Sequence, residues 1–272
     1  MYYSPFLSLL KIIIFFVWTL ICSSIQFLLL LAPKNIFFLT PKLYFKGLIF
    51  IFGIDIRFKG VPKKENVIYI SNHSSYLDIF ILGSKLDGLF VAKSEIANWP
   101  IINKICKLAK TIFINRNKKS NTKNQIATIN KFLVNGFNII LFPEGTSNDG
   151  NKVLPFKSSL FAITELNRDK NYFIQPISLS YTGFDGVPLS RFFKHYFAWY
   201  GNMDLVPHVW KLLGMGNCEI EVKYHAPKAF NEFFSRKEAC KYCFELISSQ
   251  VSKDLNANTR ENLINLYNYK YL

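Results

Sequence analysis

The alternation of short apolar runs with longer amphipathic stretches after residue 54 constrains the fold of this chain more than any other feature. Runs with the length and composition of β-strands cover residues 55–60, 67–71, 88–93, 111–115, 138–142, 172–181 and 218–225. Helical spacing of apolar residues marks residues 76–86, 99–110, 125–136, 156–167 and 235–255. Strands alternating with helices of this length build crossover units, which place the strands parallel. We therefore predict an α/β fold with a central, mostly parallel sheet flanked by helices.

A long uncharged segment precedes this region. Residues 12–32 form a run of 21 residues without a charge, which is enough to cross the core of a bilayer as a helix. Residues 43–54 are also apolar but too short to span, and no Ala-x-Ala cleavage site closes the first run. We expect a retained membrane anchor in residues 1–54, either one spanning helix or a helical hairpin, followed by one catalytic domain in residues 55–272. Lysines flank the anchor on both sides, so they do not fix its orientation.

Charge and cysteine content limit the partners and cofactors. Basic residues outnumber acidic residues by 33 to 18, and the net charge of +15 predicts anionic partners such as lipid headgroups, phosphates or nucleic acid. Biased nucleotide composition accounts for part of this excess, because Ile, Lys, Asn and Phe are abundant together. We expect no nucleic-acid partner, since no helix-turn-helix, zinc-finger or RNA-binding signature is present. The five cysteines are scattered and odd in number, so we expect no metal site and no disulfide framework.

The segment NHSSYLD, residues 72–78, places His73 and Asp78 directly behind the apolar run 67–71. One unbroken helix would not bring the two side chains together, because five helical steps rotate a side chain by about 140°. They meet if His73 ends a strand and Asp78 lies in the first turn of the following helix. Histidine then serves as a proton acceptor held by a carboxylate. On these residues alone, a capping box from Ser75 to Asp78 and a structural hydrogen bond of His73 explain the segment equally well.

Four blocks in a fixed order decide between these interpretations. NHSSYLD is followed by TIFINRN (111–117), NIILFPEGTSNDG (138–150) and QPISLSY (175–181). In this order and at these separations, over about residues 55–181, they resemble the motifs of the glycerolipid acyltransferase family, which acylates lysophosphatidate and related lysolipids. The family's motifs are His-x4-Asp, Phe-Ile-x-Arg, Phe-Pro-Glu-Gly-Thr and a proline-containing strand. A membrane-binding helical segment at the N-terminus also suits that family.

The resemblance implies roles for particular residues. His73 would be the general base that takes the proton from a glycerol hydroxyl as it attacks an acyl thioester, and Asp78 would orient His73. The acceptor and its phosphate would be bound by Arg116, Glu144, Gly145, Thr146 and Lys157. An arginine offers a planar fork of donors that matches phosphate oxygens. Many family members have arginine after Glu-Gly-Thr, whereas this chain has Ser147, and Lys152 or Lys157 are candidates to replace the lost cation.

The resemblance predicts an enzyme at a membrane. The acceptor that it favours is 1-acylglycerol-3-phosphate, giving phosphatidate, and lyso-ornithine lipid or another lysolipid is the alternative because of Ser147. A lipid or thioester hydrolase, using the same base to activate water, is a further alternative. We expect acyl-CoA or acyl carrier protein as the acyl donor, membrane lipids as partners and no cofactor. We also expect the catalytic domain on the cytoplasmic side of a bacterial inner membrane.

Overall fold

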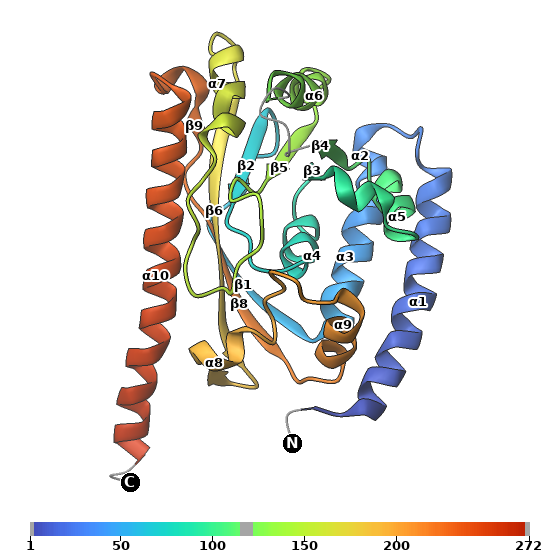
Figure 1. Ribbon diagram of the computed structural model, residues 1–272, viewed down its shortest axis with the longest axis vertical. Coiled ribbons are helices and arrows are strands. Elements are labelled where there is room, and N and C mark those ends of the chain that lie inside the picture. The colour runs from blue at the N-terminus through green and yellow to red at the C-terminus, as the bar shows by residue number, and fades with distance from the viewer. Residues whose placement is uncertain (1–2, 115–121, 270–272) are drawn as a thin grey trace.

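The computed structural model describes residues 3–114 and 122–269, and Figure 1 shows a sheet with helices on both faces. Its strands lie in the order β1-β8-β6-β2-β5-β3-β4. Their bounds are Ile54–Lys59 (β1), Val67–Ser71 (β2), Gly88–Lys93 (β3), Ile112–Ile114 (β4), Asn138–Leu141 (β5), Phe173–Phe184 (β6) and Cys218–Tyr224 (β8). The short strands Val187–Pro188 (β7) and Lys228–Ala229 (β9) both pair with β6. All pairs between β1 and β8 and among β2 to β6 are parallel, and those of β6 with β7, β8 and β9 are antiparallel. The predicted mostly parallel α/β sheet is confirmed.

Each face of the sheet has its own apolar core. Val67 and Tyr69 of β2 point to one core, and Ile68 and Ile70 point to the other, because successive strand residues face opposite sides. Helices α3 (Leu39–Phe52), α4 (Leu77–Gly83) and α9 (Leu205–Leu213) cover the first face. Helices α6 (Thr122–Val134), α7 (Ala162–Leu166) and α10 (Arg236–Tyr269) cover the second, and the predicted packing of the segment 235–255 on the sheet is confirmed by the contacts of α10 with β6.

Three predicted helices are shorter than their apolar spacing suggested. The predicted helix 76–86 is reduced to α4, Leu77–Gly83. The predicted helix 99–110 is reduced to α5, Ile102–Leu108, after a 3₁₀ turn at Ser94–Asn98. The backbone has positive φ at Ile101 and at Lys110, 69° and 52°, so a regular helix cannot pass through either residue. The predicted helix 156–167 is a 3₁₀ turn, Ser158–Phe161, followed by α7. The Lys157 N–H bonds to the carbonyl of Pro143 at 2.9 Å, which ties the start of this segment to a neighbouring loop instead of to a helix.

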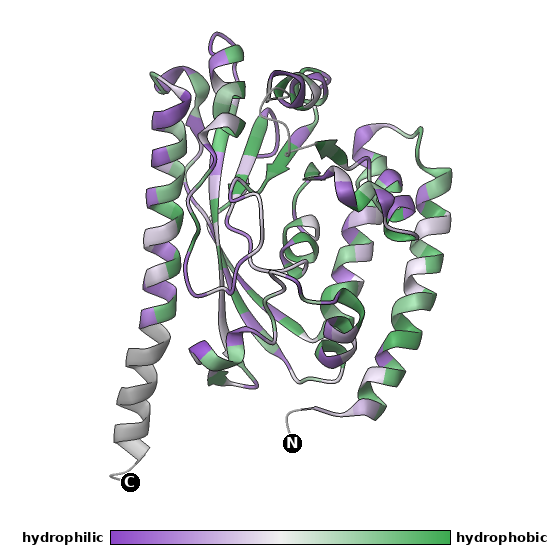
Figure 2. Cartoon of the chain, in the orientation of Figure 1, coloured by the Kyte–Doolittle hydropathy of each residue, from purple (hydrophilic) through white to green (hydrophobic). Residues whose placement is uncertain are grey.

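Three helices form the N-terminal segment: α1 (Pro5–Leu28), α2 (Lys34–Phe37) and α3. Helices α1 and α3 pack closely, since the Trp18 Nε1–H donates to the carbonyl of Tyr44 at 3.1 Å, and a Cβ on Gly47 would lie 2.2 Å from that same nitrogen. Two segments, Pro5–Leu28 and Lys34–Phe52, are long and apolar enough to cross a membrane, and only 11% and 33% of their most apolar windows are buried. Figure 2 shows that apolar residues predominate along α1. This arrangement fits a membrane anchor; the division of the chain at residue 54 and the choice between a spanning helix and a hairpin stay predictions.

The topology places β2 and β5 side by side, and the loops after these two strands carry predicted catalytic and acceptor-binding residues. Strands β2 and β5 are paired in parallel, with Ile70 opposite Leu141. Their carboxyl ends therefore lie side by side, and the loops that follow carry residues 72–76 and 142–157. Loops at the carboxyl ends of parallel strands are the usual position of ligand sites in open α/β sheets.

Candidate active site

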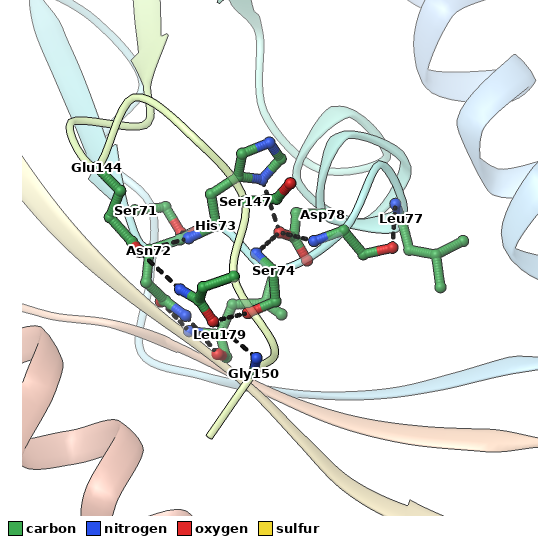
Figure 3. Close-up of polar contacts among 12 residues, drawn as sticks. Ser71, Asn72, His73, Ser74, Leu77, Asp78, Glu144, Ser147, Gly150 and Leu179 are labelled. Atoms are coloured by element: carbon green, nitrogen blue, oxygen red, sulfur yellow. Dashed lines mark hydrogen bonds and ion pairs between the residues drawn. The ribbon is translucent and has the colours of Figure 1, made fainter. Parts of the chain in front are cut away.

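His73 and Asp78 are in direct contact at the end of β2. His73 lies in the loop after the strand, and Asp78 lies in the first turn of α4, so the chain bends between them as the sequence required. The distance from His73 Nδ1 to Asp78 Oδ2 is 2.9 Å (Figure 3). Asp78 is completely buried, and the same oxygen also accepts from the backbone N–H groups of Ser74 at 2.7 Å and Ser75 at 3.0 Å. The Asp78 carboxylate thus binds the backbone N–H groups just before α4 and also orients the imidazole of His73.

The imidazole of His73 presents its second nitrogen to the surroundings. Its ring stacks on Phe142 with a centroid separation of 4.2 Å, and the side chain is 20% exposed. Within the described part of the chain, no hydrogen bond reaches Nε2. Because Nδ1 faces a buried carboxylate, the neutral ring carries its proton on Nδ1 and leaves a lone pair on Nε2. The geometry is that of a base oriented by an acid, in a side chain that is partly exposed.

Glu144 holds the two loops together. Its Oε1 accepts from the His73 backbone N–H at 2.8 Å, and its Oε2 accepts from the Asn148 amide at 2.6 Å and the Leu154 N–H at 3.0 Å. The side chain is 3% exposed; burial raises the pKa of Glu144 to about 7, while the three hydrogen bonds act to lower it. The contacts of Glu144 are with the protein, and they fix the backbone on which His73 is mounted.

Two asparagines complete this framework, and nothing in the sequence indicated their roles apart from their place in the motif blocks. Asn72 bonds both backbone groups of Leu179 on β6, its amide donating to the carbonyl and its oxygen accepting from the N–H, each at 2.9 Å. The Asn148 N–H donates to the His73 carbonyl at 3.1 Å, and its Oδ1 accepts from the Gly150 N–H at 2.7 Å. Figure 3 shows these contacts surrounding the segment from residue 72 to residue 78. The first, third and fourth motif blocks are therefore physically joined.

Comparisons with known proteins agree with this geometry. Residues 55–180 match the family described as Acyltransferase. A lyso-ornithine lipid O-acyltransferase of Rhizobium meliloti is 31% identical over 225 residues, which cover 81% of this chain and 77% of the relative. The chain belongs to the acyltransferase family. A lyso-ornithine lipid O-acyltransferase of Brucella abortus is 33% identical over 69% of this chain and 72% of its own, and a 1-acyl-sn-glycerol-3-phosphate acyltransferase of Neisseria gonorrhoeae is 28% identical over 63% and 64%.

A solved structure has the same fold as this acyltransferase. It is the 1-acyl-sn-glycerophosphate acyltransferase of Thermotoga maritima, with a TM-score of 0.68, 21% identity, and coverage of 91% of this chain and 94% of its own. At that identity the likeness speaks for the fold alone. The fold class, which was predicted from the alternating segments, is confirmed. The family and the assignment as an acyltransferase, which were predicted from the motif blocks, are confirmed as well.

The predicted acceptor-binding residues of the acyltransferase differ in their surroundings. Gly145 is buried with a φ of 77°, a left-handed conformation that glycine adopts without strain, and Thr146 is exposed beside it. Lys157 is exposed on the segment that follows the same loop, whereas Glu144 is buried in the contacts described above. Arg116 lies outside the described residues. The roles of these residues in binding the acceptor stay predictions.

Replacing Glu144 with glutamine tests the clamp between the loops. We expect the free energy of unfolding to fall by about 1–3 kcal/mol, because the new amide group must face at least one of the three buried donors and leave it without an acceptor. Denaturant unfolding in detergent measures this change. The matched control is Glu245→Gln, at a 61% exposed side chain on α10, where we expect a change within about 0.5 kcal/mol. Equal stability of the two variants would contradict the role assigned to Glu144.

Proposed function

We propose that this acyltransferase moves a fatty acyl group from an acyl thioester, either acyl-CoA or acyl carrier protein, to the free hydroxyl of a lysolipid at a membrane. The observation that carries the proposal is the buried Asp78 carboxylate 2.9 Å from His73 Nδ1, with Nε2 left to accept a proton. The family and the apolar α1 and α3 support a lipid substrate.

The reaction can be written in terms of these two side chains. The acceptor hydroxyl gives its proton to His73 Nε2 while its oxygen attacks the carbonyl carbon of the thioester. The C–S bond of the resulting tetrahedral adduct breaks, and the leaving thiolate takes the proton back from the imidazolium. The ester and the free thiol are the products. The Asp78 carboxylate stabilises the imidazolium between the two proton transfers. Because the acceptor hydroxyl attacks the thioester directly, the enzyme needs no nucleophile of its own.

For the acceptor we propose lyso-ornithine lipid. The sequence favoured 1-acylglycerol-3-phosphate, with lyso-ornithine lipid as the alternative. Two observations now support the alternative: Ser147 stands where many members have a phosphate-binding arginine, and the relatives that this chain matches over 81% and 69% of its length are named for lyso-ornithine lipid. An acceptor without a phosphate needs fewer cations in its site. Lysophosphatidate stays the second candidate, because the Neisseria relative carries that activity in its name.

An acceptor panel tests this proposal. Purified protein in detergent is given one acyl-CoA together with lyso-ornithine lipid, lysophosphatidate or lysophosphatidylcholine, and the products are identified by mass. We expect thiol release to depend on the acceptor, and kcat/KM to be at least tenfold higher with lyso-ornithine lipid than with lysophosphatidate, since one lost bidentate arginine–phosphate contact is worth about that factor. A preference for lysophosphatidate would overturn the choice of acceptor. Thiol release at the same rate with and without any acceptor would instead indicate a hydrolase.

The location of the enzyme follows in part from the same observations. The exposed apolar surfaces of α1 and α3 and the bacterial origin of the matched relatives fit an enzyme of a bacterial membrane. The position of the catalytic domain on the cytoplasmic side of the inner membrane stays a prediction, and it agrees with the cytoplasmic supply of acyl thioesters that the proposed reaction requires.

A further inference from the structure

Tyr181 contacts the Asp78 carboxylate from the far side of the site. Its hydroxyl donates to Asp78 Oδ1 at 2.7 Å, and both side chains are buried. The other three hydrogen bonds of this carboxylate, from His73, Ser74 and Ser75, all end on Oδ2. Within the described residues, Tyr181 is thus the one donor to Oδ1, and it comes from a strand 103 positions further along the chain.

The fold delivers this hydroxyl to Asp78 by fixing the register of β6. Strand β6 pairs with β2 from Val67↔Phe173 to Ser71↔Ile177. Directly after β2, Asn72 bonds both the N–H and the carbonyl of Leu179, so the register continues past the end of the ladder. Tyr181 lies two residues beyond Leu179 and therefore on the same face, which is the face covered by α4. The contact is built by backbone pairing and not by an adjustable loop.

The Tyr181 hydroxyl keeps its proton in this position. Burial, and then the neighbouring Asp78 carboxylate, raise the pKa of Tyr181 well above its ordinary value. A neutral phenol beside an ionised carboxylate can only donate, and a hydrogen bond from a neutral donor to a buried charge stabilises the charged form. Tyr181 therefore withdraws part of the negative charge that Asp78 would otherwise offer to the imidazole.

We propose that Tyr181 is a positioning residue that sets the proton affinity of His73 through Asp78. The inference rests on the proposed role of His73 as the general base. Without the phenol, the buried Asp78 Oδ1 has no donor among the described residues, and the carboxylate concentrates its charge on the imidazole. The protonated imidazole of His73 is then favoured, and a higher pH is needed to deprotonate it so that it can act as the base.

Few other charged or titratable groups face this pair among the described residues. Glu144 lies on the neighbouring loop, and its charge and that of Asp78 act on each other. The Cys218 thiol on β8 acts on Tyr181 from behind, and burial raises the pKa of Cys218 well above its ordinary value, so it stays neutral. The three printed hydrogen bonds of Glu144 do not involve the Tyr181 hydroxyl, so its removal leaves them in place.

The test is the pH dependence of kcat/KM for Tyr181→Phe in the full-length protein. We expect the low-pH limb to move to higher pH by roughly 0.5–1 unit, which is the size of one ordinary hydrogen bond expressed in pH. Above that limb, kcat/KM should stay within about threefold of the wild type, because a more strongly held proton does not remove the base. The matched control is Tyr224→Phe, at a buried tyrosine of the adjacent β8 whose hydroxyl has no hydrogen-bond partner among the described residues. Its pH profile should not move.

Fluorinated tyrosines at position 181 give the opposite change in a side chain of almost the same shape, and they keep the test decisive if Tyr181→Phe folds poorly. A more acidic phenol donates more strongly, so the limb should move to lower pH as fluorine atoms are added. The inference would be overturned if the low-pH limb of kcat/KM stayed in place both in the fluorinated series and in Tyr181→Phe. It would also be overturned if the limb moved equally in Tyr224→Phe. If His73→Ala loses turnover but the low-pH limb of kcat/KM stays in place in every Tyr181 variant, the role of Tyr181 alone is refuted. Full turnover in His73→Ala would refute the proposed function itself.

Discussion

His73→Ala is expected to lower kcat for acyl transfer by roughly 10²–10⁴-fold, because a positioned general base contributes about that factor. The substitution removes the imidazole that Asp78 holds, and the attacking alcohol then has no base at this position to take its proton. The loss should appear in single-turnover rates of ester formation, measured with saturating lysolipid and one acyl thioester. The KM for the lysolipid should change little, since the lost interaction belongs to the transition state.

A second histidine provides the control for this experiment. His195 is half-buried and contacts the rings of Phe192 and Tyr196, and among the described residues no hydrogen bond or ring contact joins it to His73 or Asp78. His195→Ala removes the same side chain from the same protein and should keep turnover within about threefold. If His73→Ala and His195→Ala have equal rates, the imidazole at position 73 is not the base and the proposed mechanism is wrong.

The strands were the part of the fold that the sequence defined most accurately. The predicted runs 67–71 and 88–93 coincide with β2 and β3 to the residue. Each is a short apolar run with polar or turn residues at its ends, and in a sheet covered on both faces such a run has no other place to be buried. The meeting of His73 with Asp78 was also predictable, because it needs only a strand end and the first turn of the next helix.

The helices and the supporting contacts depended on information that local sequence does not contain. The helix predicted at residues 156–167 begins late because Lys157 bonds to Pro143, a loop residue 14 positions earlier whose location is fixed by the sheet. Tyr181 stood at the end of the fourth motif block, yet nothing in the spacing aimed its hydroxyl at Asp78. That contact exists because the hydrogen bonds of Asn72 to Leu179 set the register of β6. The pattern of apolar residues does not predict which polar group a buried tyrosine will contact.

Asp78→Asn is expected to lower kcat by about 10³-fold while the protein stays folded. An asparagine can keep its oxygen at the position of Oδ2, where His73, Ser74 and Ser75 all donate, and can turn its amide toward Tyr181, whose hydroxyl oxygen is able to accept. The ring orientation and the Nδ1 proton of His73 then survive, and what disappears is the negative charge that stabilises the imidazolium. The low-pH limb of kcat/KM should therefore move to lower pH, opposite to the shift expected for Tyr181→Phe.

The double variants separate this electrostatic role from a structural one. If Asp78 acts only through the imidazole, His73→Ala/Asp78→Asn should be no slower than His73→Ala alone, within about threefold, because the two side chains work as one unit. If Asp78 contributes independently, the two losses multiply and the double variant falls to the uncatalysed rate. Tyr181→Phe placed on Asp78→Asn should leave the pH profile unmoved, since the carboxylate through which the phenol acts is gone. A further shift in that variant would mean that Tyr181 reaches the base by another route, and that the charge on Asp78 is not the link between β6 and the site.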